Sequence, residues 1–307
     1  MQEIGYDRPL FVQPFDHRGS FTKKFFGLQS PPALSVGDDQ RNRISEVKGL
    51  IYRGLQRAIE LGVAKEHVGV LVDVEWGLHV IHQSRQDGIP LAICVERSGQ
   101  PIFDFEYGSR WQDHLRLFKP EIVKCLVRWH PHDDAATNRE QGARLAALSE
   151  YVHDGNDHHL MFELLVPALT DEEKAMGSRY DHEVRPQRMI EAIHQIQDQG
   201  VEPDIWKIEG LETREQAEQV AAACRNTAER ATVGCILLGR GSDKEQVHKW
   251  LRVAAPVPGY IGFAVGRTNF SDPVKAFLAD PSQQEASIQA IAENYKGCVD
   301  VWLEAAG

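Results

Sequence analysis

Eight short apolar runs alternate with longer helix-type stretches along this 307-residue chain, and this alternation constrains the fold more than any other feature. The runs cover residues 9–15, 69–75, 90–96, 121–129, 159–166, 204–209, 234–239 and 260–266. Each is almost continuously apolar, as is typical of parallel strands that are covered on both faces. Eight β/α alternations in about 300 residues predict a closed (β/α)8 TIM barrel of the α/β class rather than an open sheet.

The stretches between the runs indicate one domain. Residues 41–61 and 184–198 carry apolar stripes at the spacing of an amphipathic helix. The sequence contains no low-complexity linker and no internal repeat of about 20–50 residues. We therefore expect a single barrel domain over 1–307.

Two segments extend beyond the eightfold alternation. The interval between the first two runs exceeds one helix with its loops, and Pro31 and Pro32 divide it. We expect an N-terminal extension at about 17–40, forming a lid or a short helical segment ahead of a long helix. A C-terminal helix is expected at about 284–305, and this helix and the acidic surface leave room for a homo-oligomer interface.

Polar residues predict where the last helices begin. Thr213 and Ser242 each stand three residues before a Gln or Glu, which is capping-box spacing. After the eighth run, Ser271 and Asp272 precede Pro273, and proline is tolerated in a first helical turn. We expect helices to start at these three places.

Composition narrows the partners and the compartment. A net charge of −11 argues against nucleic acid or an anionic membrane as the main partner. No apolar run approaches the ~20 residues needed to span a bilayer, and the first residues, MQEIGYDRPLF, lack the layout of a signal peptide. The five cysteines lack the spacing of metal ligands or disulfides, so we expect reduced thiols and a cytoplasmic protein.

Charged residues within the strands point to the site. Active sites of this fold lie at the C-terminal ends of the strands, and side chains alternate faces along a strand. Lys124, Glu163 and Lys207 come from strands four, five and six, which are neighbours in a barrel. Asp16 follows the first strand and Glu96 ends the third. Buried charges need one another or a substrate, so we expect these side chains to meet inside the barrel.

Such a cluster can carry chemistry. Desolvation and a nearby like charge both lower the pKa of a lysine. A neutral amine attacks a ketone and forms an imine, which is the covalent route for carbonyl substrates. Lys207, beside a second lysine and a carboxylate, is the candidate for this role.

Two alternatives remain open at this point. The cluster can be a structural ion-pair network, with Asp73 and Glu96 as further salt-bridge partners. The second alternative is a metal-dependent barrel enzyme, because several of the thirteen histidines stand in close pairs and histidine is a common metal ligand. The pairs are His79 with His82, His130 with His132, and His158 with His159. Those at 130 and 132 are predicted at the barrel mouth, where they could bind a metal or a carboxylate.

Six segments resemble one enzyme family. VQPFDHRGSF, IVKCLV, MFELL, VRPQRMIEAI, PDIWKIEG and GFAVGRTNF, in this order, are similar to motifs of the tagatose-1,6-bisphosphate aldolases. These are class I, Schiff-base aldolases on a (β/α)8 barrel, and the resemblance covers about residues 9–280. RPLFVQPFDHRGSF and LVRWHP look most like the aldolase domain fused to 5-dehydro-2-deoxygluconokinase in myo-inositol catabolism.

The resemblance implies a reaction and roles for residues. The reaction is cleavage of 2-deoxy-5-keto-D-gluconate 6-phosphate to dihydroxyacetone phosphate and malonate semialdehyde, without metal or cofactor. Lys207 is implied as the Schiff-base lysine, Glu163 as the proton-transfer group, Lys124 as the second lysine and Asp16 as a catalytic contact. The implied substrate-binding residues are Arg18, Glu96, Arg97, Arg128, His130, Gly239, Arg240, Gly266 and Arg267. The last four are implied at the phosphate, near helix N-termini.

The sequence departs from the tagatose pattern after strand four. Arg128, Trp129 and His130 stand where a tyrosine- and acid-rich stretch is expected. Arginine binds carboxylates bidentately, so this change favours a sugar acid over tagatose 1,6-bisphosphate. An aldolase for another ketose phosphate, or a non-catalytic barrel that senses a phosphosugar, remains the alternative.

Overall fold

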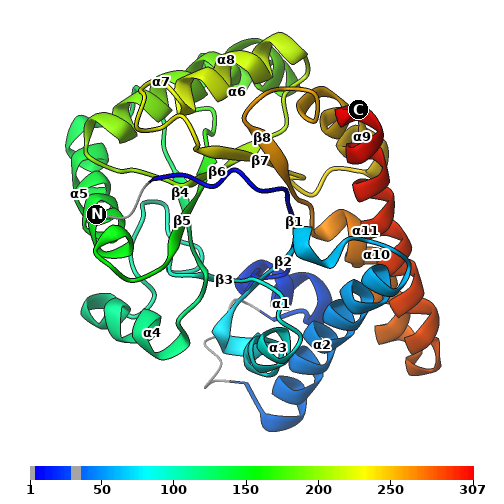
Figure 1. The fold of residues 1–307 in the computed structure, drawn as a ribbon. Coiled ribbons are helices and arrows are strands. Elements are labelled where there is room, and N and C mark those ends of the chain that lie inside the picture. The colour runs from blue at the N-terminus through cyan, green and yellow to red at the C-terminus, as the bar shows by residue number, and fades with distance from the viewer. Residues whose placement is uncertain (1–3, 29–35) are drawn as a thin grey trace.

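Eight parallel strands close into a barrel in the computed structural model, which describes residues 4–28 and 36–307 (Figure 1). The strands neighbour one another in chain order, and β8 pairs with β1. They are β1 (Leu10–Pro14), β2 (Val68–Val72), β3 (Leu91–Cys94), β4 (Ile122–Arg128), β5 (His159–Leu165), β6 (Ile205–Glu209), β7 (Gly234–Leu238) and β8 (Tyr260–Ala264). The predicted (β/α)8 barrel is confirmed, and each strand overlaps its predicted run.

Helices surround the barrel (Figure 1). The α-helices are α1 (Gly19–Phe26), α2 (Asp38–Glu60), α3 (Val74–Gln86), α4 (Trp111–Phe118), α5 (Ala135–His153), α6 (Asp171–Ala175), α7 (Arg185–Asp198), α8 (Arg214–Cys224), α9 (Lys244–Ala254), α10 (Arg267–Ala279) and α11 (Gln284–Ala306). A π-helical turn, η4 (Tyr180–Val184), precedes α7. The C-terminal α11 packs against α2, α9 and α10. Part of the expected N-terminal extension, residues 29–35, lies outside the described residues.

The core has two parts, one on each side of the strands. Inside the barrel, a buried apolar layer is formed by Leu10, Val12, Leu71, Ala92, Ile122, Met161, Ile205, Ile236 and Ala264. Outside it, the opposite strand faces pack under the helices, with Phe162 and Trp206 as examples. Because inward positions repeat every two residues, the next inward residue after Met161 is Glu163, and the next after Ile205 is Lys207. The apolar layer therefore supports the charged residues directly.

Two loop regions differ from the expectation. Asp73 follows β2 and caps α3, accepting a hydrogen bond from the Trp76 amide at 2.8 Å. Asp243, not Ser242, caps α9 in the same way, whereas Thr213 caps α8 as predicted. Short polar side chains at adjacent positions compete for one cap, and the backbone conformation decides between them.

The helix after β8 begins earlier than predicted. It starts at Arg267, so Pro273 lies inside α10 rather than in its first turn. Proline lacks the amide that would bond to the carbonyl of Asn269 four residues before it. The Asn294 side chain on α11 donates to that carbonyl at 3.0 Å instead. This tertiary contact replaces the missing helical bond.

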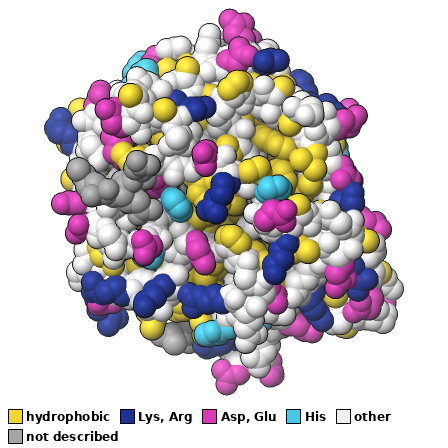
Figure 2. Space-filling view, viewed as in Figure 1, with side chains coloured by type: hydrophobic (Ala, Val, Ile, Leu, Met, Phe, Trp, Pro, Cys, Tyr) yellow, Lys and Arg dark blue, Asp and Glu magenta, His cyan; other side chains and the backbone are white. Residues whose placement is uncertain are grey.

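On the face viewed in Figure 2, charges of both signs and histidines lie over the centre of the barrel. No helix among the described residues is long and apolar enough to cross a membrane.

Asp204 ties the start of β6 to two other segments. Its fully buried carboxylate accepts hydrogen bonds from the backbone amides of Gly5 at 2.8 Å and Leu160 at 2.6 Å. The same carboxylate lies 3.0 Å from Nε2 of His153. Burial alone would raise the pKa of Asp204, but these hydrogen bonds outweigh burial and lower it to about 2. The carboxylate therefore stabilises the fold in its charged form.

We expect Asp204→Asn to change the pH dependence of stability. A lowered carboxyl pKa contributes stability that is present above about pH 4 and is lost as pH falls toward 2. At pH 6 the free energy of unfolding of the wild type should exceed that of the variant by about 2 kcal/mol. This difference should shrink at lower pH. Urea unfolding at pH 6, 5, 4 and 3.5 measures this, and a difference that does not vary with pH would contradict it.

Candidate active site

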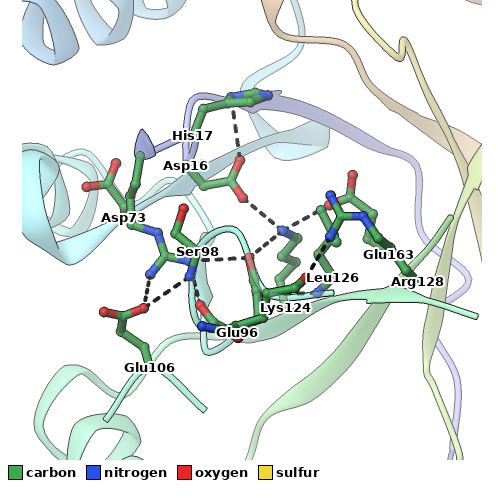
Figure 3. Close-up of polar contacts among 12 residues, drawn as sticks. Asp16, His17, Asp73, Glu96, Ser98, Glu106, Lys124, Leu126, Arg128 and Glu163 are labelled. Atoms are coloured by element: carbon green, nitrogen blue, oxygen red, sulfur yellow. Dashed lines mark hydrogen bonds and ion pairs between the residues drawn. The ribbon is translucent and has the colours of Figure 1, made fainter. Parts of the chain in front are cut away.

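The amine of Lys124 is the centre of a buried charge cluster. From β4 it points into the barrel, and its Nζ lies 2.9 Å from Asp16 Oδ2, Glu96 Oε1 and Glu163 Oε2 (Figure 3). Its side chain is 1% exposed, and each carboxylate side chain is no more than 11% exposed. One ammonium group thus bridges the ends of β1, β3 and β5.

Lys207 enters the same cluster from β6. Its Nζ lies 2.9 Å from Glu163 Oε2, the oxygen that also contacts Lys124. The residue is 4% exposed, while its neighbours Trp206 and Ile208 point outward under the helices. Alternation along the strand thus explains why a lysine stands in so apolar a segment. Lys207 has no second carboxylate within ion-pair distance among the described residues.

The charges in the cluster stabilise one another. Burial alone would lower the pKa of the Lys124 amine, but the three carboxylates outweigh burial and raise it well above its ordinary value. Burial alone would raise the pKa of Asp16 and of Glu163, but Lys124 and Lys207 lower both. These contacts therefore favour the charged forms of Lys124, Asp16 and Glu163.

Arg18 connects the β1 end to the loop after β3. It donates to Glu106 Oε2 at 2.9 Å and to the Glu96 carbonyl oxygen at 2.5 Å. Glu96 also forms an isolated bridge with Phe105, which folds the loop back on itself. Glu106 is a partner that sequence reasoning missed, because it lies in a loop without periodic pattern.

A cavity of about 970 Å³ opens above the cluster, within the range of ligand sites. Arg97 and Arg128 both line it. Arg97 lies 3.2 Å from Asp104 Oδ2, so its charge is offset. Arg128 is exposed and donates to the Gln100 carbonyl oxygen at 3.2 Å. In the described part of the chain, no carboxylate lies within ion-pair distance of Arg128.

The four residues implied at the phosphate lie after β7 and β8, outside the lining of this cavity. Gly266 caps α10, and a Cβ there would stand 2.2 Å from the Pro14 carbonyl oxygen. Arg267 lies across Gly241, whose added Cβ would be 2.8 Å from the guanidinium carbon. Gly239 lies against Val265. This region combines an arginine with the N-terminus of a 13-residue helix.

The structure does not bring Arg240 and His130 into the cavity. Arg240 lies 2.8 Å from Asp181 Oδ1 and 3.1 Å from Glu209 Oε1. His130 is buried, with Nε2 at 3.1 Å from Glu173 Oε2. Both side chains already have acidic partners, which local sequence patterns do not reveal.

Two carboxylates and a thiol lie close together, and Lys124 contacts both carboxylates. Among the described residues, Asp16, Cys94 and Glu96 offer ligand atoms within 4.8 Å of one another. Lys124 already contacts both carboxylates of this group. A divalent ion there would lie beside a fixed ammonium group, which is unfavourable. The residues present therefore fit a metal poorly.

The other histidine pairs lie elsewhere. His79 and His82 are on α3, where His79 Nδ1 lies 3.0 Å from the Ser45 hydroxyl. His158 Nδ1 lies 2.6 Å from the Pro120 carbonyl oxygen, and His159 begins β5. Neither pair reaches the charge cluster.

Fold and site together define a (β/α)8 barrel with a buried lysine–carboxylate centre. The family model described as "Uncharacterized protein conserved in bacteria (DUF2090)" matches residues 7–306, so the chain belongs to this family. A search of the curated proteins finds no match.

Solved structures share the fold. One is fructose-bisphosphate aldolase from Plasmodium falciparum, in a complex with TRAP and a small-molecule inhibitor. It is 11% identical, with a TM-score of 0.64 over 98% of each chain. At this identity, the likeness shows the barrel fold alone.

Removal of the central ammonium group should make stability depend on pH. In Lys124→Met, three carboxylates share one buried space, so their pKa values rise and protonation becomes favourable. Stability should then fall as pH rises from 5 to 8, with a loss of about 3–5 kcal/mol at pH 8. Urea unfolding at pH 5, 6.5 and 8 tests this. Lys207→Met, which leaves all three carboxylates on Lys124, is the matched control and should show a flatter profile.

Proposed function

We propose that this protein is a class I aldolase in which Lys207 forms an imine with the ketone of a phosphorylated keto sugar acid. The observation that carries the proposal is the unequal binding of the two lysines. Lys124 has three carboxylate partners and a raised pKa, which hold its proton. Lys207 has a single carboxylate contact, at 2.9 Å, so its amine is the one that is free to leave its partner and react with the ketone.

Glu163 is placed to move each proton in imine formation. It accepts a proton from Lys207 across their 2.9 Å contact, and the neutral amine attacks the ketone carbon. The new oxygen becomes a hydroxyl group by taking a proton from the nitrogen. Glu163 then returns its proton to that hydroxyl, which leaves as water and yields the iminium. Lys124 remains charged throughout and hydrogen-bonds the substrate oxygens.

Cleavage uses the same carboxylate. Glu163 takes the proton of the hydroxyl on the bond-breaking carbon, and that carbon becomes an aldehyde. The electron pair of the C–C bond moves to the iminium, which becomes an enamine. Protonation of the enamine carbon and addition of water release the ketone product and regenerate Lys207. Asp16, on the opposite side of Lys124, contacts the substrate hydroxyls.

The proposed substrate is 2-deoxy-5-keto-D-gluconate 6-phosphate, which yields dihydroxyacetone phosphate and malonate semialdehyde. Its two ends need separate cations. Arg267 and the N-terminus of α10 suit the phosphate. Arg128, exposed in the cavity without an acidic partner among the described residues, suits the carboxylate. The resemblance of the motifs to the domain fused to 5-dehydro-2-deoxygluconokinase supports the same substrate.

Borohydride reduction tests the imine. With substrate present, we expect a stable adduct on the peptide that contains Lys207, located by mass spectrometry. Lys207→Met should give no adduct and no cleavage, and a chelator should leave wild-type activity unchanged. Tagatose 1,6-bisphosphate serves as the comparison substrate. An unmodified Lys207 peptide, with a ligand that raises thermal stability, would reject the enzyme and favour a sensing barrel.

Arg128→Met tests the substrate class. Loss of a charge-assisted contact should raise KM for the sugar acid phosphate by about tenfold to a hundredfold. The same change should alter KM for a ketose 1-phosphate by less than about twofold, since that substrate has no anionic group at the end away from its phosphate. Arg139→Met is the control, because Arg139 is an exposed arginine on α5 outside the lining of the cavity. Equal effects on both substrates would contradict the assignment of Arg128 to the carboxylate.

A further inference from the structure

Lys48 is a fully buried lysine outside the charge cluster. It lies on the apolar face of α2, between Val47 and Leu50 in sequence, and is 0% exposed. Its Nζ lies 2.6 Å from Asp73 Oδ1, and Asp73 is also 0% exposed. The sequence signal was a lysine within an otherwise apolar helical stripe, four residues after Ile44.

The remaining contacts of Lys48 are with the end of β1. Its Nζ donates to the carbonyl oxygen of His17 at 3.0 Å and to that of Phe15. These two carbonyls flank Asp16 in the chain. Asp16 is therefore held on its backbone by Lys48 and on its carboxylate by Lys124, whose Nζ is 2.9 Å away.

An isolated buried ion pair is a weak source of stability. Burial removes the hydration of both charges, and replacing such a pair by apolar groups is often neutral or stabilising. Stability alone therefore does not explain the buried pair of Lys48 and Asp73. In some proteins, buried charges are retained because they fix one conformation. The conformation fixed here is that of residues 15–17, which lie after the last residue of β1.

We propose that Lys48, paired with Asp73, is a positioning residue that holds the backbone around Asp16 and so directs the Asp16 carboxylate to Lys124 and the substrate. In its kinetic part this inference rests on the proposed aldolase function. Lys48 itself touches no substrate, because Asp73 and the two carbonyls surround its amine. Its effect on turnover passes through Asp16.

The test variant removes both charges of the pair. Lys48→Met alone would strand a buried carboxylate, so the variant is K48M/D73N. Asparagine at 73 keeps a side-chain oxygen for the Trp76 amide and preserves the start of α3. We expect a melting temperature close to that of the wild type, a kcat reduced by about tenfold or more, and a KM changed by less than about threefold.

Tyr52→Phe is the matched control. Tyr52 lies on the same helix, is equally buried, and donates to Asp87 Oδ2 at 2.6 Å away from the cavity. Its loss should leave kcat unchanged. A kcat reduced as much in Y52F as in K48M/D73N would show a general effect of disturbing α2 and overturn the inference.

A mutant cycle with Asp16→Asn separates positioning from a general structural role. If Lys48 acts through Asp16, adding K48M/D73N to D16N should reduce kcat further by less than about twofold. Independent losses that multiply in the combined variant would overturn the inference.

A crystal structure of K48M/D73N tests the inference without turnover. The Asp16–Lys124 contact should lengthen beyond hydrogen-bonding distance, and a retained contact would refute positioning. If the wild type forms no imine, the proposed function fails, while this structural test still decides the role of Lys48.

Discussion

The shared contact of Lys124 with three carboxylates is the interaction on which the site depends. It links side chains from the ends of β1, β3 and β5 through one nitrogen. Such convergence needs a closed barrel, because in an open sheet the ends of β1 and β5 would be separated by the width of the intervening strands. Closure also excludes water, which strengthens each attraction and makes any missing partner expensive. The charge cluster can therefore form only in the closed barrel.

The charges near the barrel axis nearly cancel. Lys124, Lys207 and Arg18 oppose the buried carboxylates of Asp16, Glu96 and Glu163, and Arg18 also contacts the half-buried Glu106. The centre has no surplus positive charge, so in the proposed function the anionic groups of the substrate are bound by arginines outside it. Arg128 and Arg267 lie on different sides of this centre and have no ion-pair partner among the described residues. A substrate with an anionic group at each end and a ketone between fits this distribution better than a neutral sugar.

The sequence predicts the barrel and the lysine–carboxylate centre because both follow from local periodicity. Side chains alternate between the two faces of a strand, which predicts that Lys124, Glu163 and Lys207 point into the barrel. They lie close together because β4, β5 and β6 are consecutive parallel neighbours. Loop residues obey no such period. Arg240 and His130 were predicted at the substrate, yet each meets an acidic side chain contributed by a distant segment. The role of Lys48 cannot be predicted from the sequence for the same reason, since its partners at residues 15, 17 and 73 come together only in the folded chain.

Lys48 and Lys124, which hold the segment around Asp16, differ from Lys207 in how many contacts their amines make. Lys48 and Lys124 each have several acceptors, so neither can move without breaking a buried network. In the proposed mechanism their role is electrostatic and geometric, comparable to that of a metal ion fixed by carboxylates. Lys207, with one acceptor, keeps the freedom that a nucleophile needs. A barrel with fixed cations of this kind can polarise substrate oxygens and still leave one amine for covalent chemistry. The different roles of the lysines follow from the number of contacts that each nitrogen makes.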